Sequence, residues 1–245
     1  MKVRVFSSSD RAARALARVV ADAIRENPWL VLGLPTGRTP IPFYRELVAL
    51  YRADQVDFSR ATTFNLDEFV GIAPSGPGSY HAFMDRHLFE HVNLRRGRVH
   101  FLNGAAADTA AECRRYERLI RRAGGIDLQV LGLGANGHIG FNEPAPTLQA
   151  RTHRTQLRSA TRRANAPLFG HDPSRVPHEA LSMGIATILS AGRVVLLATG
   201  AAKAACVKRM VEGAITTRVP ASLLQLHANA EVWLDRAAAR KLANR

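Results

Sequence analysis

The chain has 245 residues, 47% of them hydrophobic, and a formal net charge of +14. This length and composition suit one large globular α/β domain and exclude a disordered chain. The two cysteines, Cys113 and Cys206, lie far apart in expected helices, which excludes a disulfide framework and indicates a reducing, cytoplasmic location. No apolar stretch reaches membrane-spanning length, so we expect no membrane partner.

The positive charge is spread along the chain. Arg11, Arg14 and Arg18 recur at helical spacing, which is typical of a solvated helix face. A strongly basic chain also suits a polyanion such as nucleic acid, but this scattered pattern favours a phosphorylated small molecule as the anionic partner. We therefore expect no nucleic-acid partner.

In chain order, the apolar pattern predicts strands that alternate with helices over residues 1–245, without a linker or an internal repeat. The expected strands are 3–6, 30–34, 62–65, 99–102, 128–133 and 193–199. The expected helices are one capped by Ser9 or Asp10 and ending at Glu26, then 41–52, 80–92, 108–123, 180–188 and 203–211. Two short apolar segments, 223–226 and 231–234, close the chain. This alternation predicts a single α/β domain.

The turn at 35–40 joins the second expected strand to a helix. A helix N-terminus offers free N–H groups and the positive end of its dipole, and hydroxyl groups add hydrogen bonds. An ordinary tight turn is the alternative, but the pattern favours a phosphate site formed by Thr36, Gly37, Arg38 and Thr39. After the strand 193–199, Lys203 begins another helix; this lysine suits a second phosphate contact, with a solvated lysine as the alternative.

Two adjacent carboxylates, Asp67 and Glu68, follow the strand 62–65. In an extended chain neighbouring side chains point to opposite faces, so only one of them can face a crevice. We choose Asp67 because it follows the strand most directly. The alternative is that these carboxylates cap a helix or form a pair on the surface.

His87 and His91 lie four positions apart on the expected helix 80–92. This spacing resembles a zinc motif, but the run is not HExxH and no third ligand is evident. We expect no metal.

The stretch 126–144 combines a buried strand, a glycine-rich turn and three polar residues, Asn136, His138 and Glu143. Side chains at the carboxyl end of a parallel strand face the crevice where α/β proteins bind small molecules. A histidine with a nearby carboxylate at that place indicates acid–base chemistry.

The same stretch contains the glycine spacing of a dinucleotide fingerprint, Gly132-x-Gly134-x-x-Gly137. That fingerprint requires a helix that begins at the last glycine and an acidic residue about 20 positions later. Pro144 and Pro146 interrupt any helix, and no Asp or Glu occurs between Pro144 and His171. A nicotinamide site is therefore disfavoured.

An acid-free stretch with five arginines follows, at positions 151, 154, 158, 162 and 163. It suits either a mobile cover over an anionic ligand or an exposed basic helix, and the pattern leaves both open. Beyond it, we expect 180–188 to be a buried helix packed on the sheet.

Several runs together resemble the glucosamine-6-phosphate deaminases of the glucosamine/galactosamine-6-phosphate isomerase family. The matching runs are LGLPTGRTPIPFY (32–44), FNLDEFVGI (64–72), GSYHAFM (78–84), LGLGANGHIGFNEP (131–144), LATGAAKA (197–204) and SLLQLH (222–227). They occur in collinear order over nearly the whole chain, and NGHIGFNEP together with FNLDEFVG is a specific signal.

The resemblance implies an enzyme that converts glucosamine 6-phosphate and water to fructose 6-phosphate and ammonia. It implies a modified doubly wound, mainly parallel sheet flanked by helices, as in ribose-phosphate isomerases and 6-phosphogluconolactonases, and no cofactor. By position, the resemblance implies that His138 opens the sugar ring and that Asn136 and Glu143 orient His138. Asp67 would move a proton from C2 to C1. Lys203 and the turn Thr36 to Thr39 hold the phosphate. The resemblance leaves open whether the chain forms a homo-oligomer.

The sequence departs from the family at three places. Many members carry Asp where Asn136 stands, and Asn cannot stabilise an imidazolium as strongly. A phosphate-binding Arg of the family aligns with Pro167, so either Arg162 or Arg163 substitutes for it or the phosphate is held less tightly. A patch for activation by N-acetylglucosamine 6-phosphate aligns around Pro146, His153, Thr155 and Gln156, whose residue types do not match, and we expect no such activation.

Four rival functions remain. A deaminase for the galactosamine epimer cannot be distinguished by these motifs. A 6-phosphogluconolactonase is disfavoured because such enzymes continue the GH motif with a run like TASLFP, where this chain has 139–144, IGFNEP. A non-catalytic sugar-phosphate sensor is disfavoured because Asp67, His138 and Glu143 are all present, and a nucleic-acid-binding module because no helix-turn-helix pattern is apparent.

Overall fold

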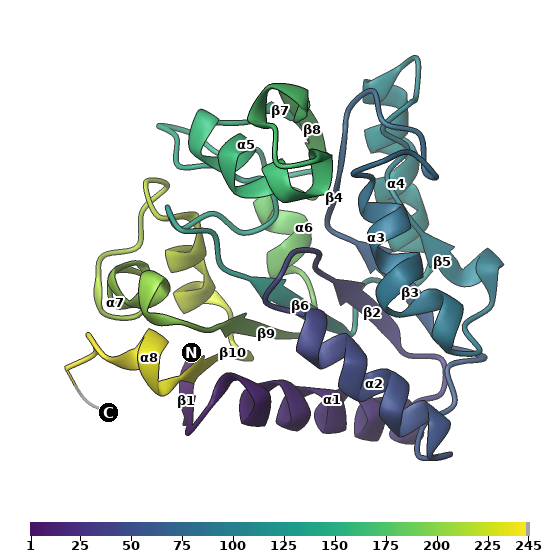
Figure 1. Ribbon diagram of the computed structural model, residues 1–245, viewed down its shortest axis with the longest axis horizontal. Coiled ribbons are helices and arrows are strands. Elements are labelled where there is room, and N and C mark those ends of the chain that lie inside the picture. Colours follow the sequence, from purple (N-terminus) through teal and green to yellow (C-terminus); the bar gives the residue numbers. More distant parts are fainter. Residues whose placement is uncertain (244–245) are drawn as a thin grey trace.

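A seven-stranded parallel sheet forms the centre of the computed structural model, which describes residues 1–243 (Figure 1). Across the sheet the order is β1 (Lys2–Phe6), β10 (Ala230–Asp235), β9 (Arg193–Ala198), β6 (Leu128–Gly132), β2 (Val31–Leu34), β3 (Thr62–Asn65) and β5 (Val99–His100). Every neighbouring pair in this order is parallel. The expected α/β class with a mainly parallel sheet is confirmed.

The order of strands reverses between β2 and β6. From β2 the chain proceeds to β3 and β5 on one side, and from β6 it proceeds to β9 and β10 on the other. Ligands of doubly wound proteins bind outside the carboxyl ends of the strands at such a switch point. The topology therefore directs attention to the loops that follow β2, β3, β6 and β9.

Helices cover both faces of this sheet. One face packs against α1 (Ser9–Glu26), α2 (Ile41–Arg52) and α3 (Tyr80–His87), and the other against α4 (Thr109–Arg122), α6 (Ile185–Leu189), α7 (Ala204–Glu212) and α8 (Arg236–Ala239). Strand side chains alternate between the two cores: Val195 and Leu197 join the first, and Val194 and Leu196 the second. Both faces are buried, which explains why the strands read as continuous apolar runs.

Helix α1 shows how local sequence sets an element. Ser8 is the N-cap, and its side chain accepts a hydrogen bond from Arg11 N, so the cap lies one residue before the expected Ser9 or Asp10. A stripe of small and apolar residues, including Ala13, Leu16 and Val20, is buried against the sheet.

A second sheet of three antiparallel strands lies above the carboxyl ends of the first. Its order is β4 (Asp67–Phe69), β8 (Glu179–Ser182) and β7 (His153–Gln156). The prediction of one helix over 180–188 is wrong, because this region contains β8 and then, after Gly184, the short helix α6. A short apolar run fits a strand and a buried helix equally well, and the partners of β8 are remote in sequence.

The arginine-rich stretch divides between a strand and a helix. Arg154 lies in β7, whereas Arg162 and Arg163 lie in α5 (Ser159–Asn165). The expectation of a single exposed basic helix is therefore wrong for the first half of the stretch.

The expected helix 80–92 is shorter than its pattern suggests. α3 ends at His87, and Phe89–His91 forms a separate 3-10 turn after Leu88 leaves helical geometry. His87 and His91 therefore do not share one helix.

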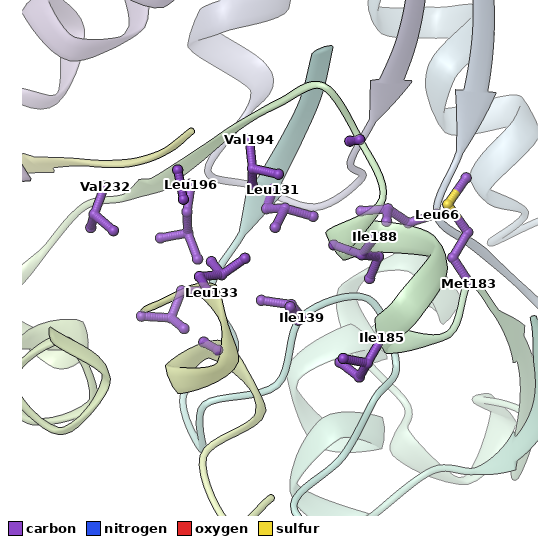
Figure 2. Close-up of a cluster of buried hydrophobic side chains, with 14 of the residues drawn as sticks. Leu66, Leu131, Leu133, Ile139, Met183, Ile185, Ile188, Val194, Leu196 and Val232 are labelled. Carbon is purple, nitrogen blue, oxygen red and sulfur yellow. The ribbon is translucent and has the colours of Figure 1, made fainter. Parts of the chain in front are cut away.

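An apolar cluster supports the loops at the carboxyl edge (Figure 2). Leu66 precedes Asp67, Ile139 follows His138, and Met183 follows Ser182; all three apolar side chains are buried in this cluster together with Leu133. Close packing holds buried side chains in single rotamers, so this cluster anchors the backbone of the polar residues beside it.

Candidate active site

A cavity of about 250 Å³ opens at the carboxyl ends of β2, β3, β6 and β9. Seven of the predicted site residues line it: Thr36, Gly37, Arg38, Thr39, Asp67, His138 and Lys203. They come from four segments that are far apart in sequence but follow adjacent strands. The tertiary structure thus brings the expected phosphate-binding and acid–base groups to one cavity.

Asp67 faces the cavity and is almost completely buried. Its Oδ1 has no hydrogen-bond partner among the described residues. Burial, assisted by the neighbouring charge of Glu68, raises the pKa of Asp67 to about 8. A buried carboxyl group without a partner, at the wall of a cavity, is suited to accept a proton from a bound molecule.

Glu68 points away from the cavity, as the alternation rule predicts for the neighbour of Asp67. Its carboxylate accepts hydrogen bonds from Ser79 Oγ and from the backbone N–H groups of Phe69, Tyr80 and His81. It therefore caps the first turn of α3. Burial raises the pKa of Glu68 although these hydrogen bonds oppose the shift.

His138 is held by Asn136 and Glu143, which lie behind it and do not line the cavity. Asn136 Oδ1 lies 2.7 Å from His138 Nδ1, and Asn136 Nδ2 donates to Glu143 Oε2 at 2.6 Å. His138 Nδ1 itself lies 3.6 Å from Glu143 Oε2. The amide of Asn136 therefore bridges the imidazole and the carboxylate.

This bridge determines the tautomer of a neutral His138. An ionised carboxylate only accepts hydrogen bonds, so the amide must turn Nδ2 toward Glu143 and Oδ1 toward His138. The amide oxygen is also only an acceptor, so His138 Nδ1 carries the hydrogen and Nε2 keeps its lone pair. The backbone allows this position because the ring lies over Gly134, where any Cβ would come within 2.4 Å of ring atoms.

Glu143 remains ionised although it is buried. Burial alone would raise its pKa, but the attraction of His138 and the hydrogen bonds from Thr161 and Asn136 lower the pKa to about 2. Arg158 adds a weak ion pair at 4.0 Å. The carboxylate thus supplies a permanent negative charge behind the histidine.

The opposite part of the cavity is cationic. Lys203 and Arg38 have no carboxylate partner among residues 1–243, and Gly37 adopts a positive φ of 102° in the turn that leads into α2. Burial, with the like charge of Arg38, lowers the pKa of Lys203 despite an opposing effect of Cys206. Two unpaired cations beside a helix N-terminus are suited to a phosphate group.

Arg162 and Arg163 do not line the cavity. The guanidinium group of Arg162 donates to the carbonyl oxygens of Val176 and Pro173, on the far side of α5. Neither arginine therefore contributes a phosphate contact in this arrangement, and Pro167 lies in the 3-10 turn Ala166–Phe169 that follows α5.

Three polar side chains that line the cavity were not predicted from the sequence: Tyr80, Thr161 and Asn165. Tyr80 donates to Asn165 Oδ1 at 2.8 Å, and Thr161 donates to Glu143. Tyr80 could have been found in the matching run GSYHAFM. Thr161 and Asn165 carry no sequence signal, because their role depends on where α5 lies over the cavity.

Residues 1–243 contain no group of three His, Cys, Asp or Glu side chains that converges to hold a metal ion. No helix in that range is long and apolar enough to span a bilayer.

The fold and the cavity define a class: a doubly wound α/β protein with a cavity at its topological switch point. A carboxyl group and an imidazole line this cavity together with two unpaired cations that suit an anionic ligand. Comparison with known proteins gives the family. Residues 7–233 match the model of the glucosamine-6-phosphate isomerases/6-phosphogluconolactonases, and the chain belongs to this family. The resemblance inferred from the sequence motifs is confirmed.

Individual relatives agree with this assignment. A glucosamine-6-phosphate deaminase 2 of Bacillus subtilis (strain 168) is 46% identical over 99% of this chain and 98% of its own length. A glucosamine-6-phosphate deaminase of Alkaliphilus metalliredigens is also 46% identical, over 98% of this chain and 99% of its own length.

Solved structures agree as well. The structure of a monomeric glucosamine-6-phosphate deaminase superposes with a TM-score of 0.95 at 44% identity and covers 98% of this chain and 100% of that one. A 6-phosphogluconolactonase of Thermotoga maritima shares the fold, with a TM-score of 0.73 at 19% identity over 95% of this chain and 97% of its own.

Proposed function

We propose that this chain is a glucosamine-6-phosphate deaminase, which isomerises the open-chain amino sugar and releases ammonia to give fructose 6-phosphate. One observation carries the proposal: Asp67 and His138 line the same small cavity as the unpaired cations Arg38 and Lys203. Such a cavity suits a molecule with a phosphate at one end and exchangeable protons at the other. The full-length relatives that share the fold bear the name of this activity.

In the proposed reaction the phosphate binds first to Arg38, Lys203 and the turn 36–39. His138 Nε2 then takes the proton of the anomeric hydroxyl and returns a proton to the ring oxygen, so that the ring opens to an aldehyde. Asn136 holds the required tautomer, and the charge of Glu143 stabilises the imidazolium that forms transiently.

Asp67 carries out the isomerisation in this proposal. Its carboxylate removes the proton from C2 while the substrate's ammonium group passes a proton to O1, which yields an enolamine, and the resulting carboxylic acid delivers its proton to C1. The product is an imine at C2, which water hydrolyses to the ketone and ammonia. The substrate's ammonium group favours ionisation of the buried Asp67, because an opposite charge in a low-dielectric cavity lowers a carboxyl pKa.

The experiment is ammonia release from glucosamine 6-phosphate by the wild-type chain and by Asp67→Asn. We expect kcat to fall about 10²- to 10⁴-fold in the variant, since general-base catalysis contributes that much. Glu68→Gln is the matched control, because this neighbouring carboxylate is buried but does not line the cavity; its kcat at pH 8 should stay within about tenfold of wild type.

Three outcomes would change the proposal. Near-normal turnover by Asp67→Asn would remove the assigned base. A higher kcat/KM for galactosamine 6-phosphate would reassign the epimer. Hydrolysis of 6-phosphogluconolactone without ammonia release from either amino sugar would place the activity with the lactonases.

We also propose that the active unit is a monomer in the cytoplasm. The structural neighbour with the TM-score of 0.95 is described as monomeric. The location follows from the proposed substrate, a phosphorylated sugar.

A further inference from the structure

A second cavity lies between α4 and β7, outside the candidate active site. Its volume is about 750 Å³, three times that of the active-site cavity, and the two share no lining residue. Five arginines line it: Arg114, Arg118, Arg121, Arg151 and Arg154. Small-molecule sites typically have volumes of about 300–1,000 Å³, so this cavity has the size of a ligand site.

Only one carboxylate lines this cavity, and it is already occupied. Glu117 accepts hydrogen bonds from Thr152 N at 2.8 Å, from Thr152 Oγ1 at 2.6 Å and from Thr187 Oγ1 at 2.6 Å. Arg151 lies 3.7 Å from the same carboxylate. Glu117 can therefore neutralise no more than one of the five guanidinium groups.

The remaining positive charge is poorly compensated. Arg154 pairs with Glu179, and Arg114 lies only at the 4.0 Å limit from Asp108. Arg118 and Arg121 have no ion-pair partner in residues 1–243. Arg114, Arg118 and Arg121 follow one another at helical spacings of four and three, an arrangement in which like charges destabilise a helix. A multiply charged anion in the cavity would relieve this repulsion.

The wall between the arginines is apolar rather than rich in hydrogen-bonding groups. Ala110 and Cys113 lie there beside Thr109 and His153; the hydroxyl of Thr152 is engaged with Glu117, and His153 Nδ1 lies 3.0 Å from the carbonyl oxygen of Arg151. Among the neutral polar lining groups, the Thr109 hydroxyl and His153 Nε2 remain for the hydroxyls of a sugar phosphate. An apolar wall and planar guanidinium groups suit a flat aromatic ring, because guanidinium planes stack on aromatic faces and also bind phosphate.

We propose that the cavity between α4 and β7 binds a nucleoside polyphosphate, with the phosphates on Arg118 and Arg121 and the base against Ala110 and Cys113. The proposal does not depend on the proposed catalytic function, because it concerns a separate cavity and is tested by binding alone.

The test is calorimetric titration of the full chain with ATP, in EDTA and at about 150 mM salt, where weak surface attraction is screened. We expect one ATP per chain, and binding at least about tenfold weaker in Arg118→Gln/Arg121→Gln, since two charge-assisted contacts are lost. Arg11→Gln/Arg18→Gln is the matched control: it removes the same charge from exposed positions on α1 and should bind ATP like wild type.

Further arms separate the alternatives. Lys203→Gln should bind ATP normally; loss of binding there would mean that ATP occupies the active-site cavity and would overturn the proposal. Inorganic triphosphate should bind more weakly than ATP, and equal affinity would refute the contact with the base. Absence of ATP binding, or an equal loss in the α1 control, would refute the site. A short single-stranded oligonucleotide that binds more tightly than ATP and is released by the same double substitution would reassign the surface to nucleic acid.

Discussion

The protonation state of one side chain, Asp67, links the chemistry of this protein to its stability. The group is buried, its Oδ1 lacks a partner, and its pKa is raised to about 8 by burial and by Glu68. A buried carboxyl group without a partner contributes little to the stability of the fold, and its raised pKa makes the ionised form a stronger base. Two predictions follow from the same shift.

The first concerns catalysis. Because the base must be ionised, we expect kcat/KM for ammonia release to increase with pH, with a midpoint near pH 8, the pKa of Asp67 in the free enzyme, and to level off above that pH. The measurement is the pH–rate profile between about pH 6 and about pH 9. A profile that is already flat across this range would show that Asp67 is ionised in the free enzyme and would contradict the assignment.

The second concerns unfolding. In the unfolded chain Asp67 returns to its ordinary value of 3.8, so between 3.8 and about 8 only the native state holds the proton. The stabilisation from this proton is complete below pH 3.8 and is lost as the pH rises through about 8. Asp67→Asn carries no charge to desolvate, so we expect it to be more stable than wild type by at least about 2 kcal/mol at pH 8 to 9. Urea unfolding of both proteins at acidic and alkaline pH tests this, and parallel pH dependences would contradict it.

Asn136 is the residue whose identity departs from many family members, and its amide has a defined task. Asn136→Leu keeps the approximate size but removes the bridge between His138 and Glu143. We expect kcat/KM to fall about 10- to 100-fold, as for other lost orienting partners. Asn136→Asp keeps an acceptor for His138 Nδ1 and should retain activity within about tenfold of wild type. Equal activities of the Leu and Asp variants would show that the bridge is not needed.

Among the secondary-structure elements, the junction of β4 with α3 connects the candidate active site to a helix that packs on the parallel sheet. Glu68 in β4 accepts three hydrogen bonds from the start of α3 and one from Phe69 N in its own strand, while its neighbour Asp67 faces the cavity. Glu68→Gln replaces one acceptor oxygen by a donor amide that faces other donors. We expect a loss of about 1–3 kcal/mol in the free energy of unfolding, measured in urea at pH 7.

The same variant tests the electrostatic coupling of the two carboxyl groups. The charge of Glu68 is one cause of the raised pKa of Asp67. In Glu68→Gln the alkaline plateau of kcat/KM should therefore begin at lower pH than in wild type. An unchanged midpoint would mean that burial alone determines the ionisation of Asp67.

The elements also show where pattern reasoning reaches its limit. The strands of the parallel sheet and most of the helices that cover it have strong apolar patterns, and their expected bounds agree with the structure to within a few residues; the helices expected over 80–92 and 180–188 are the exceptions. The second sheet was not predicted, because β4, β7 and β8 have only three or four residues each, and β4 pairs with a strand that is remote in the sequence, with Asp67 opposite Ser182. Such strands are defined by their partners and not by their own sequence.

At the scale of the whole molecule, the reversal of strand order between β2 and β6 determines where the cavity lies. It brings four loops to one cavity. Since the proposed active unit is a monomer, we expect light scattering after size exclusion to give a mass of about 26.8 kDa, with a specific activity that is constant on dilution. A multiple of this mass, together with activity lost on dilution, would show that the oligomer is the active unit.

The linear order of residues was sufficient for the class of fold and the family resemblance, and it singled out seven of the residues that line the cavity. These depend on local properties: apolar periodicity, the turn at 35–40 and the polar residues that follow the strand 128–132. Arrangement in space was needed for the rest. In the folded chain Asp67 faces the cavity and Glu68 faces α3. Arg162 lies away from the cavity, and Thr161 donates to Glu143. The physical reason is that burial, partner distance and charge compensation are properties of neighbours in space, and these neighbours lie in segments that chain order does not connect.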